Sequence, residues 1–200
     1  MGTAGEPVSD EALRVVAYSP ARTRVLDAAL DLFAQHGVSG TSLQMIADAV
    51  GITKAAVYHQ FRTKDQIVIA VTERELGRLL PALEAAEAQG NGPQARDALL
   101  ESVVEMAVRD RRLVRTLQFD PVVVRLLAEH KPFQRFMDRL YDGLLSDAGL
   151  DGRIEAAMFS GAISTAVMHP LLADIDDDTL LERLTNMIRR LLGLHRETVQ

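Results

Sequence analysis

Residues 41–64, TSLQMIADAVGITKAAVYHQFRTK, decide the fold of this chain. Apolar side chains recur at helical spacing on both sides of Gly51, a residue whose backbone turns without steric cost. Thr53 and Thr63 are typical N-cap residues, and each begins a further helical segment. The stretch therefore predicts two short helices joined by a tight turn and followed by a third helix. This arrangement is typical of proteins that place a helix in the major groove of DNA.

Helix signals continue on both sides of this stretch. Upstream, Ser19 followed by proline indicates a helix start, and Gly37 indicates a left-handed helix end. Downstream, a capping-box pattern at 63–66 opens a fourth, longer helix that runs toward Pro81 and the break at 90–93. The sequence GNGP at 90–93 is the strongest internal break.

Beyond this break the pattern stays helical, and we find no alternation of polarity that would indicate a half-buried strand. We therefore expect an all-α fold with a three-helix, helix-turn-helix DNA-binding domain and a C-terminal helical bundle for ligand binding and dimerisation. The predicted division is a mobile arm at 1–18, a head at 19–65 and the bundle at 66–200. The helices expected in the bundle after the break lie near 94–108, 110–118, 121–129, 132–147, 152–170 and 177–194.

Composition and motifs exclude several classes of protein. The chain has 200 residues and no cysteine, so disulfides, Cys-ligated zinc and a thiol nucleophile are impossible. The N-terminus has no basic segment followed by an apolar stretch, and no apolar run is long enough to span a bilayer, so we expect a cytoplasmic protein without a membrane partner. G-x-S-x-G, H-E-x-x-H and a glycine-rich phosphate loop are absent, which predicts no enzyme activity and no cofactor.

The outward face of the second helix in the opening stretch carries the chemistry of DNA recognition. Lys54 is suited to guanine, Ala55 keeps the surface low enough to meet a thymine methyl group, and Tyr58 and His59 can donate to phosphates. Hydroxyl and amide groups at the start of the preceding helix lie where its dipole favours a phosphate. The candidate DNA contacts are Thr41, Ser42, Gln44, Thr53, Lys54, Ala55, Tyr58, His59 and Lys64.

Each of these residues also has a plainer interpretation. Thr41, Ser42 and Thr53 are capping residues in any protein, the lysines are suited to a solvated surface, and Tyr58 to a half-buried core. The net charge of −6 lies mostly outside residues 20–65, where acidic and basic side chains nearly balance. We therefore expect salt-sensitive DNA binding with modest non-specific affinity, which needs two heads acting together.

The order of the motifs resembles the DNA-binding domain of the TetR family of bacterial transcriptional repressors. The resemblance runs from about Arg22 to Leu76, through AALDLFAQHGVSGTSLQMIADAVGITKAAVYHQFRTKDQIV. It implies a homodimer whose two heads read the halves of a palindromic operator in double-stranded DNA. It also implies DNA contacts at the candidate positions given above. One departure is Gln60, where many relatives carry His or Tyr, and this leaves open whether a phosphate contact is made there.

The last two expected helices are the candidates for pairing. Residues 156–166, AAMFSGAISTA, have small side chains that allow two helices to approach closely, and leucine and isoleucine recur every four residues from Leu180 to Leu192. The resemblance implies an interface of two helices from each subunit, although an intramolecular core explains the same stripe. The candidate interface residues are Ala157, Gly161, Leu184, Ile188 and Leu191.

The middle helices hold most of the aromatic and methionine side chains, which suits a pocket for an apolar small molecule. A filled core is the alternative. The candidate ligand-binding residues are Met106, Phe119, Phe133, Phe136, Met137, Tyr141, Phe159 and His169. His130 and His169 lack metal-ligand spacing to another His, Asp or Glu, so we predict no metal site.

These patterns together predict a DNA-binding transcriptional regulator, with repression relieved by a small hydrophobic ligand of unidentified structure. The fourth helix is the expected lever between the ligand and the head, because it leads from the head into the bundle. The alternative is a helical ligand-binding or interaction protein whose head no longer binds DNA. The lysines and tyrosine of the head argue against that alternative, and the acidic balance of the chain favours it.

Overall fold

The structure, a computed structural model, describes residues 18–145 and 149–194, and these residues form helices without any strand. The expected all-α fold is confirmed, while the arm predicted at 1–18 lies outside the described residues except for Tyr18. The helices of the head are α1 (Pro20–Gly40), α2 (Leu43–Val50) and α3 (Lys54–Gln60). The remaining elements are α4 (Lys64–Leu76), the short 3-10 helix η1 (Gly77–Leu79), α5 (Leu80–Ala88), α6 (Pro93–Arg109), α7 (Arg111–Phe119), α8 (Pro121–Glu129), α9 (Lys131–Leu144), α10 (Leu150–Met168), η2 (Pro170–Leu172) and α11 (Asp177–Leu191).

Side-chain caps set the helix starts in the head as the sequence predicts. The hydroxyl oxygens of Ser42, Thr53 and Thr63 each accept a hydrogen bond from the main-chain N–H three residues later. Gly51 ends α2 in the left-handed conformation, with φ 75° and ψ 35°. The turn between α2 and α3 is therefore fixed by local chemistry at both of its ends.

Two helix boundaries differ from the prediction. At Gly37 the chain takes a positive φ of 70°, but it then resumes a helical turn, so that α1 extends to Gly40. The predicted fourth helix is divided into α4, η1 and α5, and Pro81 lies within the first turn of α5. Proline fits a first helical turn because the N–H that it lacks has no intrahelical partner there.

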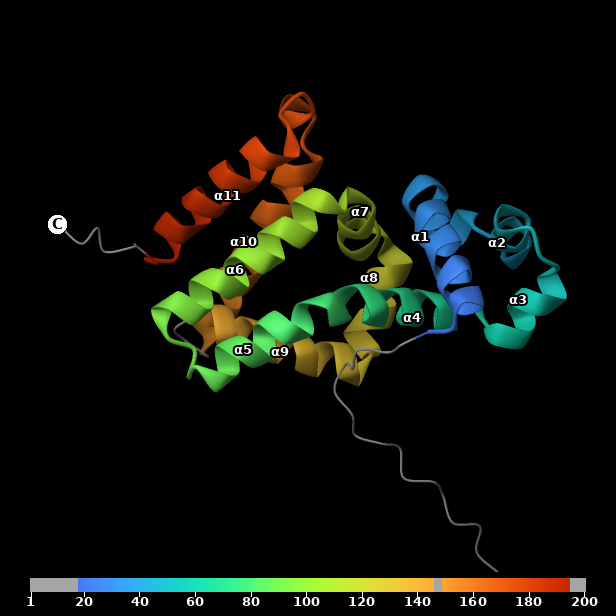
Figure 1. Ribbon diagram of the computed structural model, residues 1–200, viewed down its shortest axis with the longest axis horizontal. Helices are drawn as coiled ribbons and strands as arrows, with labels where there is room; N and C mark the ends of the chain where they lie inside the picture. Colours follow the sequence, from blue (N-terminus) through green and yellow to red (C-terminus); the bar gives the residue numbers. More distant parts are fainter. Residues whose placement is uncertain (1–17, 146–148, 195–200) are drawn as a thin grey trace, which may run out of the picture.

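The head lies at one end of the molecule, and α10 and α11 lie at the other (Figure 1). α4 leads from the head into the body, while α7 and α8 lie between the head and the rest of the bundle (Figure 1). One hydrophobic cluster joins the inner faces of α1, α2 and α3 to α4, α7 and α8, through residues such as Leu30, Val57, Ile67 and Leu113. The division at 65/66 stays a prediction, and the packing across it is continuous.

Candidate nucleic-acid interface and internal cavity

The outer face of α3 is the most exposed part of the helix-turn-helix. Val57 is completely buried and holds α3 against the head, while Lys54, Ala55 and His59 on the other side are exposed. The Tyr58 side chain is 48% exposed, and the Arg62 guanidinium lies 5.3 Å from the centre of its ring. One free helical surface therefore carries the small side chain of Ala55, the hydrogen-bond donors of Lys54 and His59, and the accessible phenol of Tyr58. Side chains of these kinds suit contact with a major groove.

The start of α2 is more divided. Ser42 and Gln44 are exposed, although the Ser42 hydroxyl caps α2 and the Gln44 amide donates to Asp48 at 2.7 Å. Thr41 is buried, and its hydroxyl donates to the main-chain carbonyl oxygens of Gly37 and Leu32 at 2.8 and 3.2 Å. The geometry favours a structural part for the Thr41 side chain, and its DNA contact stays a prediction.

Lys64, the first residue of α4, is half-buried and turned toward the end of α1. Its ammonium donates to the carbonyl oxygen of Thr41 at 2.8 Å and also to that of Val38. Carbonyl groups at a helix C-terminus carry partial negative charge and lack intrahelical partners, so a cation is stabilised there. A phosphate contact by Lys64 would compete with these bonds, and it stays a prediction.

Gln60, the position that departs from the resemblance, ends α3 and is half-buried. Its carbonyl oxygen Oε1 is buried without a hydrogen-bond partner among the described residues. Its amide nitrogen is the group that could serve a phosphate, because a phosphate oxygen accepts hydrogen bonds and donates none.

A cavity of about 160 Å³ lies within the bundle, between the end of α4 and helices α6, α7, α9, α10 and α11. Five of the eight predicted ligand-binding residues line it, namely Met106, Phe133, Met137, Tyr141 and Phe159. The other three do not. Phe136 is completely buried in the core behind it, Phe119 is 55% exposed at the end of α7, and exposed His169 caps η2 through a bond from the Leu171 N–H.

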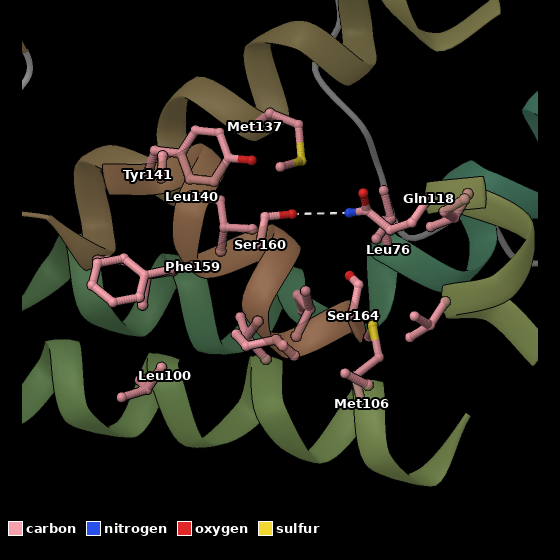
Figure 2. Close-up of a pocket in the computed structure, with 18 of the residues that line it drawn as sticks. Leu76, Leu100, Met106, Gln118, Met137, Leu140, Tyr141, Phe159, Ser160 and Ser164 are labelled. Carbon is pink, nitrogen blue, oxygen red and sulfur yellow. Dashed lines mark hydrogen bonds between the residues drawn. The ribbon is translucent and has the colours of Figure 1, made fainter. Parts of the chain in front are cut away.

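Polar groups on the cavity wall come from residues that the sequence analysis missed. Gln118, Ser160 and Ser164 join Tyr141 there, and the Gln118 amide donates to the Ser160 hydroxyl at 2.9 Å, which links α7 to α10. Figure 2 shows this bond, with Tyr141 on the same side as Ser160. Burial raises the pKa of the Tyr141 hydroxyl, and a hydrogen bond with Ser160 opposes part of that rise. Ser160 and Ser164 lie one helical turn apart within the small-residue stretch 156–166, which offered the only sequence signal for them.

The elements that line the cavity also hold the head. Leu76 at the end of α4 lines the cavity, and Arg74 two residues earlier pairs with Asp27 of α1 at 2.8 Å. On α7, Arg112 pairs with Asp31 of α1 at 2.6 Å. Two routes therefore connect the cavity wall to α1, one through α4 and one through α7.

Asp120, between α7 and α8, adds a third contact with the head. One carboxylate oxygen accepts the N–H groups of Val122 and Val123 and caps α8, while the other accepts the N–H of Val38 at 2.7 Å. A Cβ at Gly37 would lie 3.2 Å from that second oxygen, and φ is positive there, so this approach favours glycine on both grounds.

The predicted interface residues separate into two groups. Ala157, Gly161 and Leu191 are exposed, whereas Leu184 and Ile188 are buried against α6 and α10 in an intramolecular cluster. These two side chains pack within the core of their own chain, and their place in an interface stays a prediction. The large apolar residues that are exposed on these helices are Leu150, Ile154 and Met158 of α10 and Met187 and Leu191 of α11.

In the described part of the chain, no three His, Cys, Asp or Glu side chains are grouped as metal ligands would be. Nor does any described helix combine the length and apolarity that a membrane span requires.

Comparison with known proteins shows what the head and the fold are similar to. Residues 25–71 match the profile of a family described as bacterial regulatory proteins, tetR family. The HTH-type transcriptional regulator AcrR of Shigella flexneri is 35% identical over 94 residues, which cover 46% of this chain and 43% of that protein. The HTH-type transcriptional regulator UidR of Escherichia coli K12 is 28% identical over 168 residues, which cover 78% of each.

A solved structure extends the likeness to the whole fold. FadR from Bacillus subtilis, in complex with stearoyl-CoA, aligns with a TM-score of 0.63 over 87% of this chain and 99% of that one. The sequences are 18% identical in this alignment, so the likeness concerns the fold.

Proposed function

Because this chain belongs to the TetR family of bacterial regulatory proteins, we propose that it is a cytoplasmic, homodimeric transcriptional repressor that a small molecule releases from a palindromic operator. The observation that carries the proposal is the free surface of α3. Lys54, Ala55, Tyr58 and His59 are all exposed on a helix that buried Val57 fixes to the head. A helix held in this way can enter a major groove with little change of shape.

Two copies of the head are needed for specific binding. The chain carries a net charge of −6, so long-range attraction to phosphate is weak and one short helix offers few contacts. In a two-fold dimer, the recognition helices of the partners would lie about 34–36 Å apart, one turn of DNA. The exposed apolar side chains of α10 and α11 are the surface that we propose for pairing, and such an interface would be isologous.

The cavity is the proposed effector site, and α4 and α7 are the proposed levers. Both helices contribute to the cavity wall, and both form ion pairs with α1. Suppose that the effector binds more tightly when the head is placed so that it does not fit the operator. It then lowers operator affinity by the difference between its binding free energies to the two placements. The mechanism thus needs no contact between effector and DNA.

Gel shift and footprinting with DNA upstream of the chain's own gene test this function. We expect a protected palindrome at low salt. The Lys54→Ala variant should lose discrimination at one base position at a cost of about 1–3 kcal/mol. The matched control is Lys131→Ala, because Lys131 is also exposed but lies at the start of α9.

Two results would argue against this scheme. A uniform loss of affinity for all sequences in Lys54→Ala would make Lys54 a phosphate contact instead of a base contact. Failure of the wild-type protein to bind any promoter fragment specifically would favour the alternative, a ligand-binding protein without a working head.

A further inference from the structure

The wall of the cavity is chemically uniform apart from one polar group of side chains. All the lining residues that the structure describes are uncharged, and all but Gln118, Tyr141, Ser160 and Ser164 are apolar. Burial favours the protonated form of Tyr141, so its hydroxyl adds no charge near neutral pH. Ser160 is half-buried and Gln118 is exposed, so the loss of hydration concerns the apolar part of the wall. A charged group moved from water to that part would lose its hydration without gaining an opposite charge, which is costly.

The size of the cavity sets a second limit. At about 160 Å³ it matches the apolar cavities of about 150 Å³ that hold a benzene molecule. A molecule with one substituted ring therefore fits the cavity as it stands.

The polar group of side chains sets the third limit. Ser160 already takes part in hydrogen bonds with Gln118 and Tyr141, and these three side chains come from α7, α10 and α9. Because Gln118 donates through its amide nitrogen, its carbonyl oxygen can accept a hydrogen bond, and the Tyr141 hydroxyl can donate one or accept one. A ligand hydroxyl placed beside Ser160 would complete this group.

We propose that the effector is a small uncharged molecule with one aromatic ring or an apolar body of that size and one hydroxyl, which Gln118 and Ser160 recognise. This inference rests on the proposed function, since it assigns the chemistry of the effector site. It makes Gln118 the residue that determines specificity. It also distinguishes this protein from a regulator that binds a long acyl-CoA, because the cavity suits neither the phosphates nor the long acyl group of such a ligand. Gln118 also lies two residues before Asp120, so a ligand that binds it acts directly on the segment that contacts the head.

Isothermal titration calorimetry with the full-length protein, without DNA, tests the ligand class through probes of equal size. The uncharged probe is p-ethylphenol, whose hydroxyl has a pKa of about 10 and stays protonated at neutral pH. Its partners are p-toluate, p-methylbenzylamine and p-ethyltoluene, which carry a negative charge, a positive charge and no hydroxyl. We expect p-ethylphenol to bind about 100-fold more tightly than either ion and about 5- to 10-fold more tightly than p-ethyltoluene.

Variants assign the hydroxyl preference to its residue. Gln118→Leu and Ser160→Ala should bring p-ethylphenol and p-ethyltoluene to nearly equal affinity while p-ethyltoluene still binds. The control is Ser102→Ala, because the Ser102 hydroxyl donates to Ala98 within α6 and Ser102 does not line the cavity. It should keep the wild-type preference.

Three results would overturn the proposal: no binding of p-ethylphenol, equal or tighter binding of either ion, or tighter binding of stearoyl-CoA. The gel shift of the previous section is a separate measurement. A protein that shifts its operator but prefers stearoyl-CoA would keep the proposed function and lose this inference. A protein that binds p-ethylphenol but no DNA would keep the assigned ligand class and lose the proposed function.

Discussion

At the scale of single residues, Lys64 shows how a charge in the head can serve structure. Its ammonium donates to the carbonyl oxygens of Val38 and Thr41, at the junction where α1 gives way to α2. The Lys64→Met variant should lower the free energy of unfolding by about 1–3 kcal/mol, because two hydrogen bonds from a charged donor are lost and the Thr41 carbonyl oxygen loses its donor, while that of Val38 keeps the Thr41 N–H. Urea denaturation measures this change, with Lys131→Met as the exposed control.

The salt dependence of DNA binding separates this role from a phosphate contact. If Lys64 serves only the junction, Lys64→Met keeps the slope of log K against log salt concentration. A lost phosphate contact would make that negative slope shallower by about 0.9 per head. A shallower slope without a change in stability would contradict the structural role that we assign to Lys64.

Sequence and structure agree best where a residue acts on its own neighbours. Thr53 and Thr63 cap helices as expected, and Gly51 turns as expected, because these effects depend on a few adjacent residues. The contact between Asp120 and the Val38 N–H spans 82 positions of the chain. Nothing local in the sequence reveals which distant N–H group the second oxygen of Asp120 accepts.

The lining of the cavity is also difficult to predict from the sequence. Hydrophobicity and helical spacing identify side chains that face inward, but they do not separate a cavity wall from a filled core. Phe133, Phe136 and Met137 lie within five consecutive residues of α9. Phe133 and Met137 line the cavity, while Phe136 is completely buried behind it. The difference depends on how neighbouring helices pack, which is a property of the tertiary structure.

At the scale of elements, the junction of α7 and α8 depends on the Asp120 carboxylate. Asp120→Ala removes the cap of α8 and the acceptor for Val38, and we expect it to lower the free energy of unfolding by about 2–4 kcal/mol. Asp120→Asn keeps one acceptor oxygen but replaces the other with an amide nitrogen that only donates, so it should keep either the cap of α8 or the bond from Val38 and cost less than Asp120→Ala. Urea denaturation of the two variants measures both losses, and equal losses would show that a single remaining acceptor oxygen does not stabilise the junction.

The stability that the start of α11 gives to the fold should depend on pH. The Asp176 carboxylate accepts the Thr179 N–H at 2.9 Å, and this bond holds the pKa of Asp176 below its ordinary value of 3.8. A depressed folded-state pKa means that the stabilisation is complete above the ordinary value and is lost as the pH falls through the folded-state value. The neighbouring carboxylates Asp177 and Asp178 pair with Arg111 and Arg109, so their charges are largely compensated.

Asp176→Asn isolates this contribution, because asparagine also caps helices but does not titrate. At pH 7 the variant should unfold at a lower urea concentration than the wild type. The difference should shrink as the pH falls below 3.8 and vanish once wild-type Asp176 is protonated in both states. A difference that stays constant from pH 7 to the acid limit would contradict the link to this carboxylate.

At the scale of the whole molecule, the exposed apolar side chains and the negative charge belong to one argument. Leu150, Ile154 and Met158 lie four residues apart on α10 and are 71%, 49% and 68% exposed. Water contact with this row is unfavourable, and burial against a second copy would remove it. Pairing would also bring together the two heads that a chain of net charge −6 needs in order to hold DNA.

Met158→Glu tests both halves of this argument. In a two-fold interface the substitution buries one unpaired negative charge from each subunit, at a cost of several kcal/mol, which is about a thousand-fold in the dimer dissociation constant. Light scattering should therefore report the mass of a single chain where the wild type gives twice that mass, and circular dichroism should report unchanged helix content, because Met158 is exposed within its own subunit. The matched control is Val124→Glu, since Val124 is 49% exposed but lies on α8. The monomer should also lose specific binding to the full operator, because one weakly charged head then acts alone. A Met158→Glu protein that stays dimeric would show that the interface lies elsewhere. A monomer that still binds the operator tightly would contradict the need for two heads.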